Sequence, residues 1–228
     1  MAMRAGDFAR RVGGAIGIAA EGVTMAATVT GLGALALVLG WYWAGMAAIL
    51  CGLATAAFFR DPERSPASPS SERLVFSGAD GTVSDVAEMP LPDGVAGERY
   101  HRVSVFMSPL NVHVNRAPVG GEIVSVRHTP GAFHAAFRDY ASEQNERNLI
   151  VLSDARGRQH AMMQIAGYLA RRIVCRLHPH DTVRCGERIG LIMFGSRVDH
   201  FVPPDYRVVV KVGERVRAGE SIIGELLQ

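Results

Sequence analysis

The stretch Val183-Arg-Cys-Gly-Glu-Arg-Ile189 recurs near the end of the chain as Val216-Arg-Ala-Gly-Glu-Ser-Ile222. In each copy an apolar segment leads into a turn centred on glycine and out into a second apolar segment. Pro118-Val-Gly-Gly-Glu-Ile-Val124 has a similar character. The repeat therefore predicts short strands joined by glycine turns.

The sequence around these turns extends the same pattern from Leu74 to the C-terminus, with short apolar segments punctuated by glycine and proline. V-x-x-G-E turns of this kind recur in barrel-sandwich folds related to lipoyl domains. We therefore expect a mainly β domain with a barrel-sandwich-like architecture. The candidate strands are Leu74–Ser77, Gly81–Val86, Arg102–Met107, Gly121–Arg127, Asn148–Ser153, His160–Ile165, Arg188–Met193, Arg207–Val210 and Glu220–Leu226. Residues 166–175 fit either a strand or a short helix.

The N-terminal part is different, because residues 22–59 contain no charged side chain. One transmembrane helix needs about 20 apolar residues, so this run is too long for one helix and for a signal peptide. It predicts a hydrophobic helical hairpin, with arginines at both ends that favour the cytoplasmic side. Two full spans and a shallow re-entrant hairpin both remain open. The expected organisation is a membrane-associated hairpin over 1–60, a linker over 61–73 and a β-rich domain over 74–228.

Composition excludes several classes of function. The net charge is only +2, so no nucleic-acid partner is indicated. The three cysteines form no C-x-x-C pair, so neither a metal site nor a disulfide framework is expected. Lys211 is the single lysine among 24 basic residues, and it lies in an apolar run. A pyridoxal-phosphate enzyme or a lipoyl carrier needs a well-placed lysine, so an imine-forming carbonyl would have to come from elsewhere.

Gly195-Ser196 could supply that carbonyl. A serine hydroxyl can attack the preceding carbonyl, and β-elimination from the resulting ester then gives an N-terminal pyruvoyl group. Two further segments carry candidate site residues. Ser77-Gly-Ala-Asp-Gly-Thr-Val83 places Asp80 in a tight turn, and Ser108-Pro-Leu-Asn-Val-His-Val-Asn-Arg-Ala-Pro118 places His113 in an apolar setting.

Together with three more motifs, these segments resemble the short, membrane-anchored form of the phosphatidylserine decarboxylases. The motifs lie in the expected order over most of the chain, and their combination is specific although each alone is weak. They are Phe59-Arg-Asp-Pro-Glu-Arg64, Ala79-Asp-Gly81, the segment 108–118, Asn145-Glu-Arg-Asn148 and Phe194-Gly-Ser-Arg-Val-Asp199.

The resemblance implies a proenzyme that cuts itself between Gly195 and Ser196. The β-chain (1–195) and the α-chain (196–228) would stay together as a heterodimer, and Ser196 would become the pyruvoyl cofactor. The amine of phosphatidylserine would condense with this ketone to give a Schiff base, lose carbon dioxide and leave as phosphatidylethanolamine. The expected location is the cell membrane, with the catalytic domain on the cytoplasmic side.

The resemblance, together with the chemistry of the residues themselves, suggests roles for the other site residues. His113 is the candidate base for cleavage and a proton donor afterwards, with Asp80 orienting or charging it. Longer relatives have a second histidine where this chain has Arg116, so His113 serves both tasks or another residue takes one over. Arg116 and Arg127 are candidate contacts for the lipid phosphate. His200 follows the cleavage site closely and could shape it.

A rival interpretation is a non-enzymatic membrane adaptor with a lipoyl-like domain. It accounts for the hairpin and for the V-x-x-G-E turns. It leaves Gly195-Ser196 and His113 without a purpose, and the long helical arm that such adaptors usually have is missing from the sequence.

Overall fold

A computed structural model describes residues 17–66, 73–92, 99–134, 144–168, 172–193 and 195–227. Part of the predicted linker (67–72) and Phe194 of the last motif lie outside these ranges. The chain divides into two compact units between Glu63 and Arg64, and each is described by itself.

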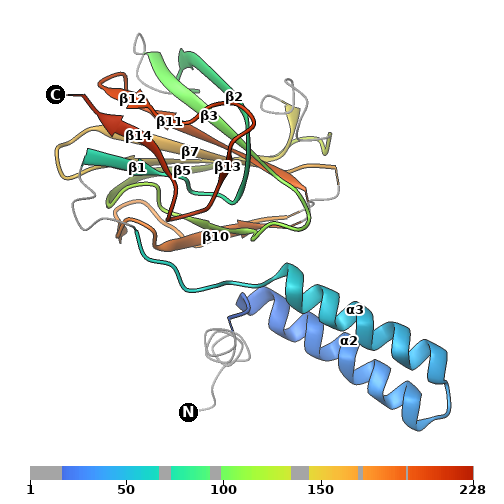
Figure 1. Ribbon diagram of the computed structural model, residues 1–228. Helices are drawn as coiled ribbons and strands as arrows, with labels where there is room; N and C mark the ends of the chain where they lie inside the picture. Colours follow the sequence, from blue (N-terminus) through green and yellow to red (C-terminus); the bar gives the residue numbers. More distant parts are fainter. Residues whose placement is uncertain are drawn as a thin grey trace, which may run out of the picture. The chain divides into compact units, whose positions relative to one another are not determined.

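The N-terminal unit is a pair of apolar helices, α2 (Ala20–Val38) and α3 (Tyr42–Phe58), which lie side by side (Figure 1). Small residues let them pack closely: a Cβ added at Gly52 would lie 2.1 Å from Thr30 Oγ1. Large apolar side chains point outward instead, including Leu32, Leu50 and Trp43. The predicted helical hairpin is confirmed, and α2 is long and apolar enough to cross a membrane.

The second unit is built from short strands, which confirms the mainly β fold (Figure 1). The strands are β1 (Leu74–Phe76), β2 (Gly81–Pro90), β3 (Arg99–Met107), β4 (Val114–Arg116), β5 (Gly121–Thr129), β6 (Arg147–Ser153), β7 (Gln159–Ile165), β8 (Ile173–Cys175), β9 (Thr182–Val183), β10 (Arg188–Ile192), β11 (Ser196–Val202), β12 (Tyr206–Val208), β13 (Arg215–Val216) and β14 (Ile222–Leu226).

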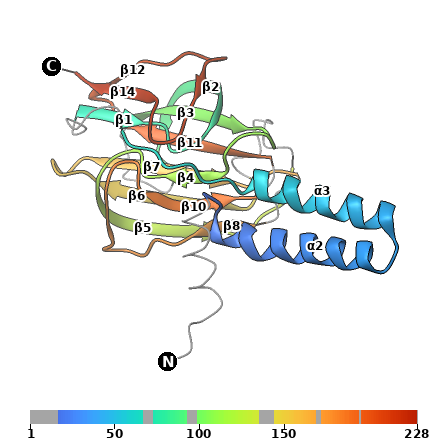
Figure 2. The ribbon, with the colours of Figure 1, turned by 60° about the horizontal axis from the view of Figure 1, so that its bottom comes forward.

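These strands form one large sheet and two small ones. The eight-stranded sheet has the order β13-β2-β3-β11-β7-β6-β5-β9, and Figure 2 shows its part from β2 to β5 running down the view. The three-stranded sheets are β1-β14-β12 and β4-β10-β8. All the pairings within these sheets are antiparallel, and β11 lies near the centre of the large sheet with all seven residues buried.

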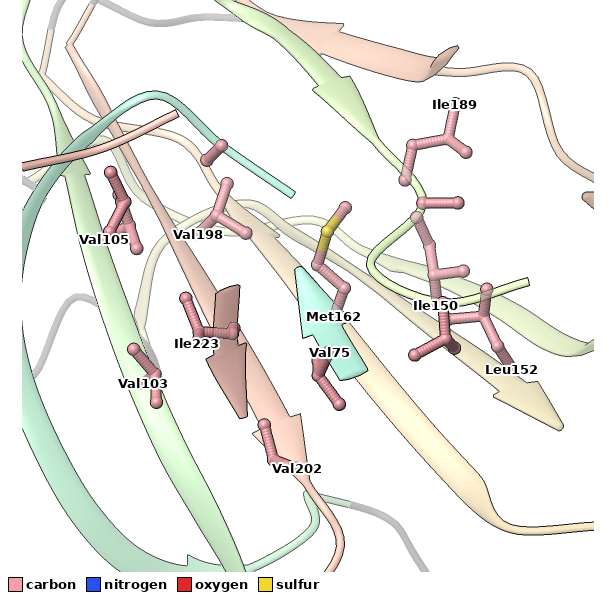
Figure 3. Close-up of a cluster of buried hydrophobic side chains, with 14 of the residues drawn as sticks. Val75, Val103, Val105, Ile150, Leu152, Met162, Ile189, Val198, Val202 and Ile223 are labelled. Carbon is pink, nitrogen blue, oxygen red and sulfur yellow. The ribbon is translucent and has the colours of Figure 1, made fainter. Parts of the chain in front are cut away.

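The main hydrophobic core lies between the large sheet and the small ones. Figure 3 shows side chains of the large sheet, such as Val103, Val198 and Met162, together with Val75, Ile189 and Ile223 from the small sheets. A second apolar cluster lies on the other side of the large sheet and includes Tyr100, Met163 and Phe201. Alternate residues of β11 therefore belong to different clusters, and Ser196, Val198 and His200 share the face of the main core.

The pairing registers reveal an internal repeat that is larger than the sequence suggested. β2 pairs with β3 with an irregularity between Val83 and Asp85, and β5 pairs with β6 with one at the equivalent place, between Ile123 and Ser125. The V-x-x-G-E turns occupy matching positions, with Val216 opposite Gly81 and Val183 opposite Gly121. We call β1–β3 with β11–β14 the outer repeat, and β4–β10 the inner repeat.

The inner repeat is inserted into the outer repeat. β6 and β7 are joined directly, and Ser153 pairs with Gln159 across their hairpin. The equivalent strands of the outer repeat are β3 and β11, whose sequences are separated by the whole inner repeat although Phe106 pairs with Arg197. The chain therefore leaves the outer repeat after Met107 and returns to it at Ser196. Gly195-Ser196 lies at the point of return.

Candidate active site

Gly195 and Ser196 mark an abrupt change of surroundings along the backbone. Gly195 has φ +60, a left-handed conformation that glycine adopts without the steric cost of a Cβ. Ser196 is fully buried as the first residue of β11, where it pairs with Met107. Its hydroxyl donates to the Met107 sulfur at 3.4 Å. The bond between Gly195 and Ser196 thus joins a loop to a strand that is held on both sides.

His113 lies on a segment that runs beside this junction. The segment connects β3 to β4, while residues 193–195 connect β10 to β11, and these strands pair as β3 with β11 and β4 with β10. The amide of Ile192 donates to the carbonyl of His113 at 3.3 Å. The structure therefore brings the segment of His113 to the residues that precede the predicted cleavage site.

The imidazole of His113 is buried in a defined tautomer. Only 2% of the residue is exposed, and Nδ1 lies 2.9 Å from the carbonyl oxygen of Asn111. Because that oxygen can only accept, Nδ1 carries a proton, and in the neutral ring Nε2 then keeps the lone pair. This is the state that a general base requires.

Asp80 is held by a different set of contacts from the one expected. Its carboxylate pairs with both terminal nitrogens of Arg64, one of them at 2.9 Å, and accepts from the amide of Ala218 at 2.8 Å. Arg64 also donates to the carbonyl of Ala218 at 3.0 Å. Both side chains are nearly buried, and removing one partner of such a pair typically costs about 3–5 kcal/mol.

These contacts connect Asp80 to the last V-x-x-G-E turn. Among the described residues no hydrogen bond or ion pair joins Asp80 to His113. The orienting role of Asp80 stays a prediction. The Asp80 carboxylate therefore links its own turn to the Arg64 side chain and to the turn that contains Ala218.

Buried amides near the site were not singled out from the sequence. Gln164 Nε2 donates to Asn115 Oδ1 at 2.9 Å, and Asn148 Nδ2 donates to Gln164 Oε1 at 3.0 Å. Asn115 also lies 3.8 Å from the same Met107 sulfur that Ser196 contacts. Asn115 and Asn148 lie within the quoted motifs, but nothing in the sequence shows that Gln164 connects them.

The two arginines suggested for the lipid phosphate have different surroundings. Arg116 is 3% exposed and donates to the carbonyl of Gly186 at 2.9 Å, so its burial disfavours contact with a headgroup. Arg127 lies exposed on β5. Lys211 is also exposed, between β12 and β13. In the described part of the chain, no group of three histidine, cysteine or acidic side chains could hold a metal ion.

A cavity of about 330 Å³ lies at the opposite end of β7 from Ser196. Asp154, Arg156, Arg184, Cys185 and Tyr206 contribute to its lining. Arg158 lies beside this cavity. In the pairing register, Arg158 occupies the position in the inner repeat that Ser196 occupies in the outer repeat.

The cavity therefore corresponds in position to the candidate site but has no hydroxyl at the equivalent of Ser196. Burial raises the pKa of the Cys185 thiol to about 11, so Cys185 stays protonated and is a poor nucleophile. Burial also lowers the pKa of nearby His160, although its bond to Asp154 opposes the shift.

Comparison with known proteins gives a consistent family assignment. The sequence model of the family described as phosphatidylserine decarboxylase matches residues 52–224. The phosphatidylserine decarboxylase proenzyme of Mycolicibacterium smegmatis is 45% identical over 186 residues, which cover 81% of this chain and 79% of the relative. The proenzyme of Ruegeria pomeroyi is 45% identical over 195 residues, with 83% and 84% covered. That of Desulfotalea psychrophila is 45% identical over 174 residues, with 76% and 79% covered.

Proposed function

The chain belongs to the phosphatidylserine decarboxylase family, and we propose that it converts phosphatidylserine to phosphatidylethanolamine with a pyruvoyl group made from its own Ser196. The observation that carries the proposal is the position of Gly195-Ser196. A glycine with positive φ precedes a buried serine, where the chain re-enters the outer repeat beside the segment of His113.

Self-cleavage needs a base, because an unassisted serine hydroxyl is a weak nucleophile. We assign this role to Nε2 of His113, with Nδ1 held by the carbonyl of Asn111. The Ser196 oxygen adds to the Gly195 carbonyl, and the amide becomes an ester. Loss of the Ser196 α-proton then expels the Gly195 carboxylate and leaves a carbon–carbon double bond. Addition of water releases ammonia and leaves the ketone.

The residues around Ser196 fit a pyruvoyl group at this position. The new N-terminus would lie at the first residue of β11, which is paired with β3 and β7 and therefore stays in place when the preceding bond is broken. The pyruvoyl carbonyl would bind the amine of the substrate and accept the electrons released with carbon dioxide. His113 would then be close to the site and could return a proton to the product.

The two chains are expected to remain associated after cleavage. The α-chain supplies β11–β14, and three of these strands pair with strands of the β-chain: β11 with β3 and β7, β13 with β2, and β14 with β1. It also contributes Val198, Val202, Tyr206, Val216, Ile223 and Leu226 to the main core. Since burial of apolar surface dominates folding stability, breaking one peptide bond leaves this interface intact.

Purified wild-type protein tests the proposal directly. On a denaturing gel we expect a large and a small fragment, which co-migrate as one complex on a sizing column without denaturant. Mass spectrometry should give a small fragment of residues 196–228 that is lighter than the serine-containing peptide by one ammonia. A chain that stays intact for days, with the Ser196 hydroxyl unchanged, would refute the pyruvoyl mechanism.

We further propose that the helical unit places the enzyme on the cytoplasmic face of the cell membrane. The outward-facing leucine and tryptophan side chains and the arginines that flank the apolar run support this. In inverted, cytoplasm-out vesicles, added protease should digest the β-rich unit. Protection of that unit in intact vesicles, with digestion after detergent, would contradict the placement.

A further inference from the structure

His200 makes two hydrogen bonds inside the core, and they connect β11 to the turn that carries Asp80. Its Nε2 accepts from the amide of Gly78 at 2.7 Å, and its Nδ1 donates to the carbonyl of Val103 at 3.2 Å. Only 1% of the residue is exposed. Burial lowers its pKa to about 4, so the ring is neutral at physiological pH and Nε2 keeps its lone pair.

The inner repeat shows why this acceptor is needed. His200 and Met162 pair with each other across β11 and β7, and each holds the same place in its own repeat. Gly78 and Pro118 are equivalent because they accept matching hydrogen bonds from the opposite repeat. The amide of Arg116, in the inner repeat, donates to the Gly78 carbonyl at 3.0 Å. The amide of Phe76, in the outer repeat, donates to the Pro118 carbonyl at 2.9 Å.

Proline has no amide hydrogen, so the inner repeat needs no acceptor at the position equivalent to His200, which Met162 occupies. Glycine has one, and in a dry core it must be bonded, because an unsatisfied buried donor is costly. Gly78 cannot be replaced easily, since an added Cβ would lie 2.7 Å from the Arg116 carbonyl oxygen. His200 thus supplies the hydrogen-bond acceptor for a buried amide that is present in the outer repeat and absent from the equivalent position of the inner repeat.

The Gly78 peptide touches all three segments that carry the proposed site residues. Its amide bonds to His200, on the same strand as Ser196. It lies two residues before Asp80 in the same turn. Its carbonyl accepts from the amide of Arg116, and more weakly from Asn115 at 3.4 Å, both on the strand that follows His113.

We propose that His200 is a positioning residue for self-cleavage: by accepting from Gly78, it sets the register between the segments of Ser196, Asp80 and His113. This rests on the proposed function, because it assigns His200 a role in the maturation of Ser196. His200 does not touch the reacting bond. A misplacement of about 1 Å among reacting groups can cost about 100-fold in rate, so losing this contact should slow cleavage strongly.

The test compares the first-order rate of self-cleavage in newly synthesised full-length chains. His200→Met copies the inner repeat and removes both hydrogen bonds, and His200→Asn is too short to reach Gly78 but can still bond Val103. We expect both to accumulate uncut chain, with rates about 10- to 100-fold lower than wild type. His200→Gln can place an acceptor near the Nε2 position and should recover most of the rate.

Stability is measured separately, by thermal unfolding of each variant in a Ser196→Ala chain. Leu152→Ala is the matched control, because Leu152 is a fully buried core residue in the inner repeat that pairs with His160 rather than with a neighbour of Gly78. It should lower the unfolding midpoint but leave cleavage near the wild-type rate. The inference is overturned if His200→Met and His200→Asn cleave like wild type, or if rate follows the unfolding midpoint in every variant. Failure of the wild-type chain to cleave would instead overturn the proposed function.

Discussion

The Ser196→Ala variant is expected to remain one uncut chain and to lose all decarboxylase activity. Without the hydroxyl there is no nucleophile to attack the Gly195 carbonyl, and no precursor of the ketone. The substitution removes one oxygen whose only described bond is to the sulfur of Met107, a weak acceptor, so the fold should be preserved. A denaturing gel and the rate of phosphatidylethanolamine formation give both readouts.

Ser84→Ala is a suitable control for this loss. Ser84 lies exposed on β2 and donates to the Ser104 carbonyl at 3.3 Å. The Ser84→Ala protein should cleave itself and decarboxylate the substrate at wild-type rates. Decarboxylation by uncut Ser196→Ala protein would contradict the pyruvoyl mechanism, even if the family assignment stands. Normal cutting in this variant would show that another bond is the cleavage site.

Much of the β-domain can be predicted from its sequence, because apolar segments and glycine turns alternate regularly. β11 was not among the predicted strands. Its sequence, Ser196-Arg-Val-Asp-His-Phe-Val202, contains four polar residues although the whole strand is buried. Buried strands usually read as continuous apolar runs. Here Arg197 forms an ion pair with Asp199 at 2.8 Å, and His200 bonds to Gly78, so these side chains have buried partners that sequence alone does not show.

The candidate site is predictable to a similar degree. Gly195, Ser196 and His113 could be found because their motifs are local. The contact between Asp80 and Arg64 could not, since Arg64 comes from the predicted linker and nothing in its sequence indicates a buried partner. The insertion of one repeat into the other was also hidden. The two repeats resemble each other in sequence only at their V-x-x-G-E turns. Both turns require a glycine in the left-handed conformation, with φ 77 at Gly186 and φ 73 at Gly219.

The insertion would allow the proposed cut to be made without loss of the fold. A cut between Gly195 and Ser196 falls where the inner repeat ends, so the β-chain would keep the inner repeat whole. The outer repeat would then be completed by strands of both chains, joined by hydrogen bonds and core packing. Cleavage inside either repeat, for example within β6, would instead divide a hairpin. A break at the junction would leave the hairpin of β6 and β7 whole.

The His113→Ala variant should show the second large effect, a loss of about 10²- to 10⁴-fold in the rate of self-cleavage. The variant removes the proposed base but leaves the backbone bond between His113 and Ile192. If His113 also returns the proton to the product, decarboxylation per cut chain should fall as well. Long incubation provides enough cut protein to measure this second rate, and the gel gives the fraction that is cut.

His128→Gln is the matched control, because His128 lies exposed on β5 and its ring pairs with Glu146 at 3.1 Å, away from the proposed site residues. It should leave both rates unchanged. Cleavage of His113→Ala at the wild-type rate would exclude His113 as the base. Slow cleavage with full activity per cut chain would restrict His113 to maturation. Another residue must then supply the proton in decarboxylation, and buried Arg116 is too basic to act as that donor.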